Sequence, residues 1–120
     1  MVKSLVLAEP PVHQWVKDVP GGDVLYKEFM TNFWEPVRKA FQQGDTVQAM
    51  RVFVNGLSST RTFDDLAAEA RSVIMRNARA IGALTRSSEP FPDLPKNKVS
   101  ELRIPSLIVT GVNTIKIHKR

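Results

Sequence analysis

Two short apolar runs lie near the two ends of the chain. Residues 4–8 read SLVLA and residues 106–110 read SLIVT, the second between Pro105 and Gly111. Short apolar runs that do not alternate with polar residues are typical of strands covered on both faces, as in parallel sheets. We therefore expect two buried strands that pair in parallel, joined by a long helical excursion.

A helical pattern follows the first run. Between residues 23 and 43 an apolar residue recurs at every fourth position, which places these side chains on one stripe of a helix. The stripe consists of Leu25, Phe29, Phe33, Val37 and Phe41. Pro36 interrupts it, and either kinks one helix or begins a second one.

Helix signals continue to residue 84. Gly44 suits a helix end and Asp45 an N-cap, and the apolar residues up to Leu57 again have helical spacing. Thr62 with Asp65 three residues later resembles a capping box, which predicts a third helix over residues 63–84. Residues 87–96 contain three prolines and should be extended, and residues 98–103 could form a helical turn before the second strand.

The predicted order is therefore strand, several helices, strand. A two-stranded parallel sheet has too little pairing and cover to be stable alone. The pattern indicates a mostly helical α/β fragment with two short parallel-type strands at its two ends, which would belong to a larger sheet.

Several phrases resemble the α/β-hydrolase family over essentially the whole chain. "SLVLAEPP" (4–11) and "RIPSLIVTG" (103–111) look like the strands that flank its helical cap, and "GDTVQAMRVFVNGL" (44–57) is similar to a cap helix of esterase-like and epoxide-hydrolase-like members. The resemblance implies a single partial domain over residues 1–120. Its parts are a strand (2–9), a helical cap-like insertion (12–95), a short helix with the returning strand (98–111) and a basic tail (112–120).

The strongest signature of that family does not occur in this sequence. The family carries its nucleophile on a G-x-S-x-G turn, and the nearest segment, "GLSST" (56–60), has Thr60 in place of the last glycine. The family's catalytic histidine follows the returning strand at a greater distance than His118 does. We interpret His118 as part of a basic, solvated helix start and His13 as a loop or cap residue.

Glu9 is the one residue with a catalytic interpretation. In haloalkane dehalogenases and related members the acid of the triad ends this earlier strand, so the resemblance makes Glu9 the candidate triad acid. Other members place an aspartate after the returning strand, where residues 112–114 offer Val, Asn and Thr. The alternative is that Glu9 only ends the strand and caps the following turn.

Three aromatic residues are candidates for a substrate pocket. Trp15, Trp34 and Phe33 could line a pocket for an apolar molecule, since such sites are mostly apolar. Aromatic residues at helical spacing are more often simple core, and both interpretations stay open.

Composition narrows the function classes. The chain has 42% hydrophobic and 24% charged residues, as soluble globular proteins do, and it has no run long enough to span a membrane. It has no cysteine, which excludes disulfides, thiol nucleophiles and zinc-thiolate sites. We expect a cytoplasmic protein with no organic or metal cofactor.

The net charge of +5 does not by itself predict nucleic-acid binding. Three of these charges lie in the basic tail, on Lys116, Lys119 and Arg120. No aromatic-basic stacking motif or recognition-helix pattern accompanies them, so nucleic acid is not an expected partner.

We therefore expect a truncated α/β-hydrolase-like protein whose parent activity is hydrolysis of a small ester or related apolar substrate. Without the nucleophile and the late histidine, it should be inactive alone, and a small apolar substrate would bind only if the fold were completed. The alternative is a non-catalytic interaction module. It would form a homo-oligomer or complement a partner chain through its exposed strand edge.

Overall fold

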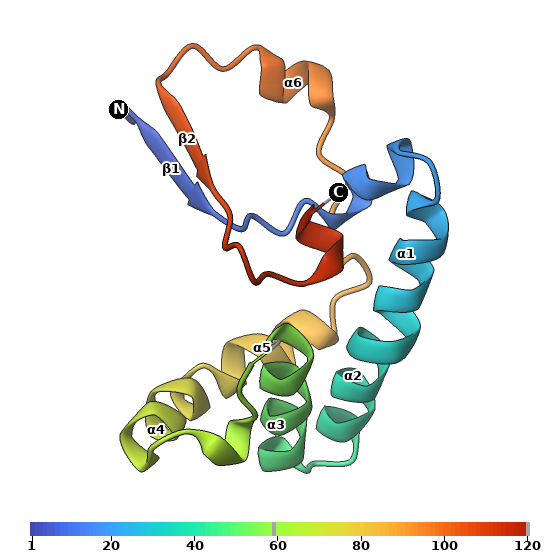
Figure 1. Ribbon diagram of the computed structural model, residues 1–120, viewed down its shortest axis with the longest axis vertical. Coiled ribbons are helices and arrows are strands. Elements are labelled where there is room, and N and C mark those ends of the chain that lie inside the picture. The colour runs from blue at the N-terminus through green and yellow to red at the C-terminus, as the bar shows by residue number, and fades with distance from the viewer. Residues whose placement is uncertain (59, 120) are drawn as a thin grey trace. The chain divides into compact units, whose positions relative to one another are not determined.

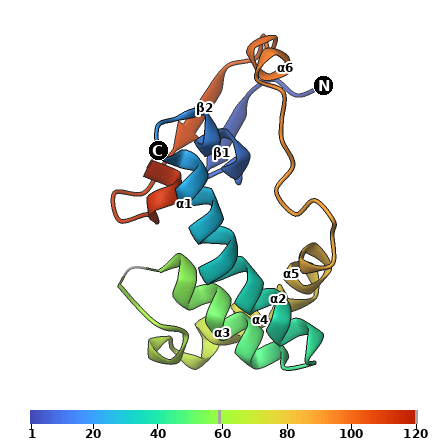
Figure 2. The ribbon, with the colours of Figure 1, turned by 90° about the vertical axis from the view of Figure 1, so that its right-hand side faces the viewer.

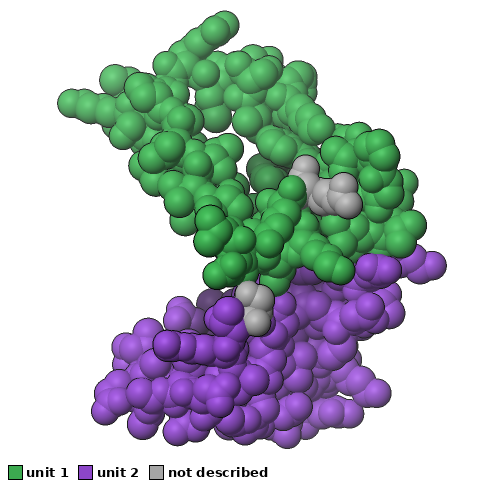
Figure 3. Space-filling view, viewed as in Figure 1, with its two compact units in different colours: residues 1–26, 91–120 green, residues 27–90 purple. Residues whose placement is uncertain are grey.

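The computed structural model describes residues 1–58 and 60–119, so Ser59 of the "GLSST" segment lies outside the described residues. The chain forms two compact units, which Figure 3 shows in green and purple. Residues 1–26 and 91–120 form the first, which we call the sheet unit, and residues 27–90 form the second, which we call the helical unit.

The sheet unit contains the two predicted strands. β1 (Leu5–Ala8) and β2 (Ser106–Val109) pair in parallel, with Leu5 opposite Ser106 and Ala8 opposite Val109 (Figure 1). The prediction of two parallel strands in a mostly helical chain is therefore confirmed.

Shorter elements complete the sheet unit. A 3₁₀ helix at His13–Asp18 follows β1 and leads to α1 (Gly22–Phe29). After the helical unit, the chain forms α6 (Lys96–Ser100) and a 3₁₀ helix at Lys116–Lys119. This last helix lies within the predicted basic tail. The proline-rich residues 87–95 contain no helix or strand, as predicted, and α6 begins two residues earlier than expected.

The faces of the sheet are not buried. Val6 and Ile108 are 65% and 63% exposed, and Leu107 and Val109 are exposed as well. The prediction of strands covered on both faces is therefore wrong for the described residues. Apolar residues allow a strand to be covered, but cover requires neighbouring strands and helices, and in the described part of the chain the sheet has two strands.

The helix predicted over residues 23–43 forms as one continuous run, visible in Figure 2. α1 passes into a π-helical turn at Met30–Trp34 and then into α2 (Glu35–Gln42). Pro36 lies in the first turn of α2. Proline lacks an N–H and its ring crowds the carbonyl four residues earlier, so a wider turn just before it lets the helix continue.

The helical unit continues with α3 (Thr46–Leu57), which begins as predicted. The Asp45 side chain accepts a hydrogen bond of 3.0 Å from the N–H of Gln48, the bond of an N-cap. Gly44 has a φ of 76°, the left-handed conformation that ends many helices and that glycine adopts most readily.

The single helix predicted over residues 63–84 is wrong. The capping box exists, since Thr62 N–H donates to Asp65 at 2.9 Å, but it caps a 3₁₀ helix at Phe63–Asp65. Two separate helices follow, α4 (Ala68–Arg76) and α5 (Ala78–Thr85).

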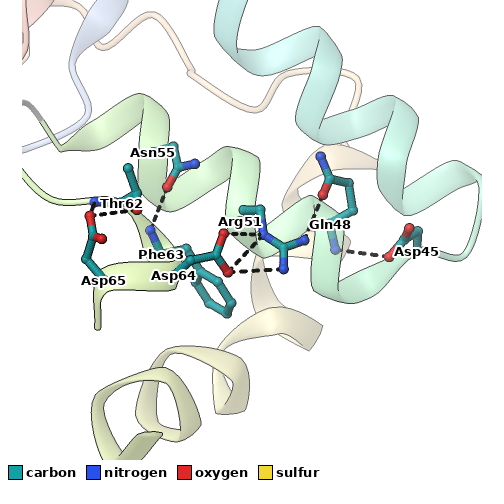
Figure 4. Close-up of polar contacts among 8 residues, drawn as sticks. All are labelled: Asp45, Gln48, Arg51, Asn55, Thr62, Phe63, Asp64 and Asp65. Atoms are coloured by element: carbon teal, nitrogen blue, oxygen red, sulfur yellow. Dashed lines mark hydrogen bonds and ion pairs between the residues drawn. The ribbon is translucent and has the colours of Figure 1, made fainter. Parts of the chain in front are cut away.

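Contacts with α3 explain the early interruption. Asn55 accepts a hydrogen bond of 2.7 Å from the N–H of Phe63, and the Arg51 guanidinium binds Asp64 at 3.0 Å (Figure 4). These contacts hold the 3₁₀ turn against α3, and the chain is extended after it.

The helical unit has a packed apolar core. Met50, Phe63 and Ala78 form a buried cluster, against which partly buried side chains of α2 to α5 pack. Val37, Ala49 and Trp34 are also buried. None of the helices in the described ranges is long and apolar enough to cross a membrane.

Candidate functional site

Glu9 directly follows β1 in an uncommon backbone conformation. Its φ is 47°, in the left-handed region that residues with a Cβ rarely adopt. Its N–H still donates to the carbonyl of Val109 at 2.9 Å, so the residue closes the parallel ladder. Its carboxylate Oε1 accepts a hydrogen bond of 3.0 Å from the N–H of Gly111, just after β2. Glu9 therefore joins the carboxyl ends of both strands.

His118 lies beside that carboxylate. Its side chain is only 13% exposed, and its Nδ1 is 3.6 Å from Glu9 Oε2 and 3.0 Å from the hydroxyl oxygen of Thr114. The interpretation of His118 as a solvated residue is therefore wrong. The neighbouring residue Ile117, on the same 3₁₀ helix, is buried.

The polar contacts of this group lower the pKa of Glu9. A hydrogen bond from Thr114 contributes most to a Glu9 pKa below its ordinary value, followed in the same direction by the Gly111 N–H and the charge of His118. An ionised carboxylate only accepts hydrogen bonds, so Thr114 donates its O–H to Glu9. The Thr114 oxygen can then accept from a protonated Nδ1 of His118.

His13 contacts the other nitrogen of His118. The two Nε2 atoms are 2.9 Å apart, and the Phe91 ring lies 4.7 Å from the His13 ring. Only 7% of His13 is exposed. Burial, and then the charge of His118, lower the pKa of His13 from 6.5 to about 4, so His13 is neutral at neutral pH.

These side chains border a pocket of about 230 Å³ within the sheet unit. Glu9, His13, His118 and Thr110 supply its polar atoms. The apolar lining comes from Val12, Trp15, Val16, Ile108 and Ile117, together with Pro10. The indole N–H of Trp15 donates to the carbonyl of Leu94 at 2.7 Å, which holds this side chain in place.

The four residues predicted for the site belong to different units of the chain. Glu9 and Trp15 both line the pocket of the sheet unit. Phe33 and Trp34 are buried in the helical unit, where the Phe33 ring lies 5.8 Å from that of Phe53. There they have the core environment that the alternative interpretation describes.

Sequence reasoning missed His13 and His118 as site residues. One signal could have found them, because both histidines follow soon after the carboxyl end of a parallel strand. The carboxyl ends of neighbouring parallel strands meet at one edge of the sheet, where ligand sites of α/β proteins form.

The arrangement places a carboxylate beside an imidazole without a direct hydrogen bond, since Oε2 of Glu9 is 3.6 Å from Nδ1 of His118 and Nδ1 is 3.0 Å from the Thr114 hydroxyl oxygen. A carboxylate that orients an imidazole and stabilises its charged form is the acid–base part of a catalytic triad. Within the described ranges, no group of three or more His, Cys, Asp or Glu side chains is arranged to hold a metal ion. Comparison with protein-family models, curated proteins and solved structures finds no match to this chain.

Proposed function

We propose that this chain forms an α/β-hydrolase-like portion in which Glu9 and His118 act as an acid–base pair. The proposed parent activity is hydrolysis of a small ester or related apolar substrate. One observation carries the proposal: the Glu9 carboxylate, at the carboxyl end of β1, lies 3.6 Å from Nδ1 of His118 beside a mostly apolar pocket.

Two further features support this assignment. The strands that resemble those of the family are paired in parallel and in register, and Glu9 has the position of the triad acid in the family members that carry it on the earlier strand. His118 follows the returning strand more closely than the family's histidine does. It is therefore assigned by its contact with Glu9 and not by the resemblance.

We expect no turnover by this chain alone. A carboxylate and an imidazole move protons, but acyl transfer also needs a nucleophile, and the sequence has no G-x-S-x-G turn to present one. The test is release of p-nitrophenol from the acetate and butyrate esters by the purified chain.

Free imidazole has some esterase activity of its own, so the matched control is His118→Gln. The proposal predicts release no faster than with this variant and with heat-inactivated protein. Saturable turnover that His118→Gln abolishes would overturn the expectation of inactivity alone.

A second candidate function is a non-catalytic interaction module. The exposed apolar side chains of Val6, Leu107, Ile108 and Val109 favour it, because exposed sheet faces and strand edges readily pair with other chains. Self-association, or complementation by a partner chain, would cover them.

Sedimentation velocity over a wide concentration range tests the module. We expect association that Ile108→Lys weakens and that Val73→Lys, at an exposed apolar position of α4, leaves unchanged. A monomer at every concentration, with no binding of a dye for apolar surfaces, would exclude this function.

A further inference from the structure

We propose that the pocket of the sheet unit binds a small neutral alcohol or phenol, whose hydroxyl group inserts between the Nε2 atoms of His13 and His118. This inference rests on the proposed function and extends it. An alcohol or phenol is the leaving group of an ester, so the pocket would hold one product of the hydrolysis.

The contact between the two imidazoles has the geometry of a hydrogen bond. The Nε2 atoms are 2.9 Å apart, while the ring centroids are 5.1 Å apart and the ring planes differ by 25°. The centroid separation exceeds the nitrogen separation by about two ring radii, so the nitrogens face each other along the line between the rings. At this separation one nitrogen donates and the other accepts.

The contact of 2.9 Å places one proton between the two Nε2 atoms, and a neutral His13 agrees with this. His13 is buried against Phe91 and neutral at neutral pH, with a pKa of about 4. The groups facing Nδ1 of His118 are the Glu9 carboxylate and the Thr114 hydroxyl. The lysines on either side of His118, Lys116 and Lys119, lie on its own helix. The pair therefore offers a ligand one donor and one acceptor.

A hydroxyl group can bond to both the donor and the acceptor. It donates one hydrogen bond and accepts others, so when the two rings move apart by roughly 2 Å it can replace the contact between them without leaving either nitrogen unpaired. A carboxylate only accepts and an ammonium group only donates, so each would leave one imidazole nitrogen unmatched. The charge of Glu9 also repels an anion.

The rest of the pocket suits an apolar body. Val12, Trp15, Val16, Ile108 and Ile117 line it, and its volume is about 230 Å³. An apolar cavity of about 150 Å³ is large enough for benzene. One aromatic ring with a small substituent therefore fits.

The experiment is an NMR titration of the full chain at pH 7.5 with three ligands of the same shape: 4-methylphenol, toluene and 4-methylbenzoate. The ring signals of His13 and His118 and the indole signal of Trp15 report the pocket. The indole signal of Trp34, in the helical unit, serves as the internal reference.

We expect 4-methylphenol to shift the signals of both histidines and of Trp15, and to bind at least about tenfold more tightly than toluene, since toluene leaves the hydrogen-bonding groups unused. We expect 4-methylbenzoate to bind more weakly than 4-methylphenol. Equal affinity for phenol and toluene, or saturable shifts that leave both histidines unchanged, would overturn the inference.

A variant of His13 tests whether the preference for the phenol depends on the pair of imidazoles. His13→Gln should reduce the preference for phenol over toluene, while Lys119→Gln, on the same helix as His118, should keep it. If His13→Gln unfolds the sheet unit, the three-ligand comparison on the unaltered chain still decides.

The outcomes separate this inference from the proposed function. Loss of the hydroxyl preference removes the alcohol site but leaves the Glu9–His118 pair in place. Ester turnover by the chain alone contradicts the expected inactivity but leaves the ligand preference untouched.

Discussion

The two units of this chain differ in how well their regular elements are covered. The helices of the helical unit bury Val37 and Met50 almost completely. The sheet unit leaves Val6 and Ile108 of its strands exposed, and its buried residues, which include His13, lie outside the strands. Packing therefore stabilises the helical unit. The sheet unit depends more on strand pairing and on polar contacts around its pocket, so its stability should respond to pH and to single polar changes.

The largest expected effect is in the helical core. Met50→Ala removes a side chain that is 1% exposed, and should lower the free energy of unfolding of the helical unit by about 2–5 kcal/mol. Val47→Ala, at a position of the same helix that is 49% exposed, should cost less than about 0.5 kcal/mol. Denaturant unfolding followed at Trp34 measures both, and equal costs would contradict the packed core.

Acid should instead destabilise the sheet unit. The pKa of His13 is about 4 in the folded chain and 6.5 ordinarily. Between these values the unfolded chain binds a proton that the folded chain excludes, so stability falls as the pH falls through this window. The expected loss is roughly 3 kcal/mol, with no further change above the window.

Glu9 acts in the same direction at lower pH. Its pKa lies below the ordinary value, so the stability it contributes is present at neutral pH and is lost on protonation. Thermal unfolding between pH 7.5 and 3, followed at Trp15, measures both losses, that of His13 first and that of Glu9 at the acid end. His13→Gln should flatten the dependence of stability on pH near pH 5 to 6. An unchanged dependence would show that His13 titrates normally.

A smaller effect tests the close packing of α3. A Cβ atom on Gly56 would lie 2.1 Å from Cδ2 of Phe33, so Gly56→Ala should cost about 1–3 kcal/mol. Phe33→Leu in the same chain should recover part of that cost, because the two sites are coupled. Additive costs, measured by denaturant unfolding, would mean that the ring does not approach this glycine.

The smallest stability effect belongs to the sheet face. Ile108→Lys should change the free energy of unfolding of the sheet unit by no more than about 0.5 kcal/mol, because the side chain is already 63% exposed. Thermal unfolding of dilute protein measures it. A loss of about 2 kcal/mol or more would show that this face is covered.

The same contrast shows what the sequence could predict. Apolar runs predicted both strands and their parallel pairing, and local signals such as the Asp45 N-cap predicted helix starts. The division after residue 65 was not predictable from periodicity, because Asn55 and Arg51 of α3 hold the 3₁₀ turn through polar contacts that the spacing of apolar residues does not reveal. The exposure of the strands also depends on whether other strands or helices cover them. The residues of the strands themselves do not determine this.

The site was predictable only in part. Glu9 was chosen as a candidate because the resemblance assigned a role to its position, and that role stays a prediction. His118 was missed because it follows the second strand more closely than the catalytic histidine of the family does. The contact with His13 joins residues 105 positions apart. It depends on the turn from Gly111 to Thr114, after which the last 3₁₀ helix packs against the 3₁₀ helix at His13–Asp18.

The most direct test of the account is an NMR measurement of the two imidazoles at neutral pH. A scalar coupling between the Nε2 nuclei of His13 and His118, together with a proton on Nδ1 of His118, is the predicted result. It would establish the hydrogen bond between the rings and the orientation of His118 toward Thr114 and Glu9. An unprotonated Nδ1 of His118 would contradict the acid–base pair, and two uncoupled imidazoles would contradict the hydrogen bond between the rings.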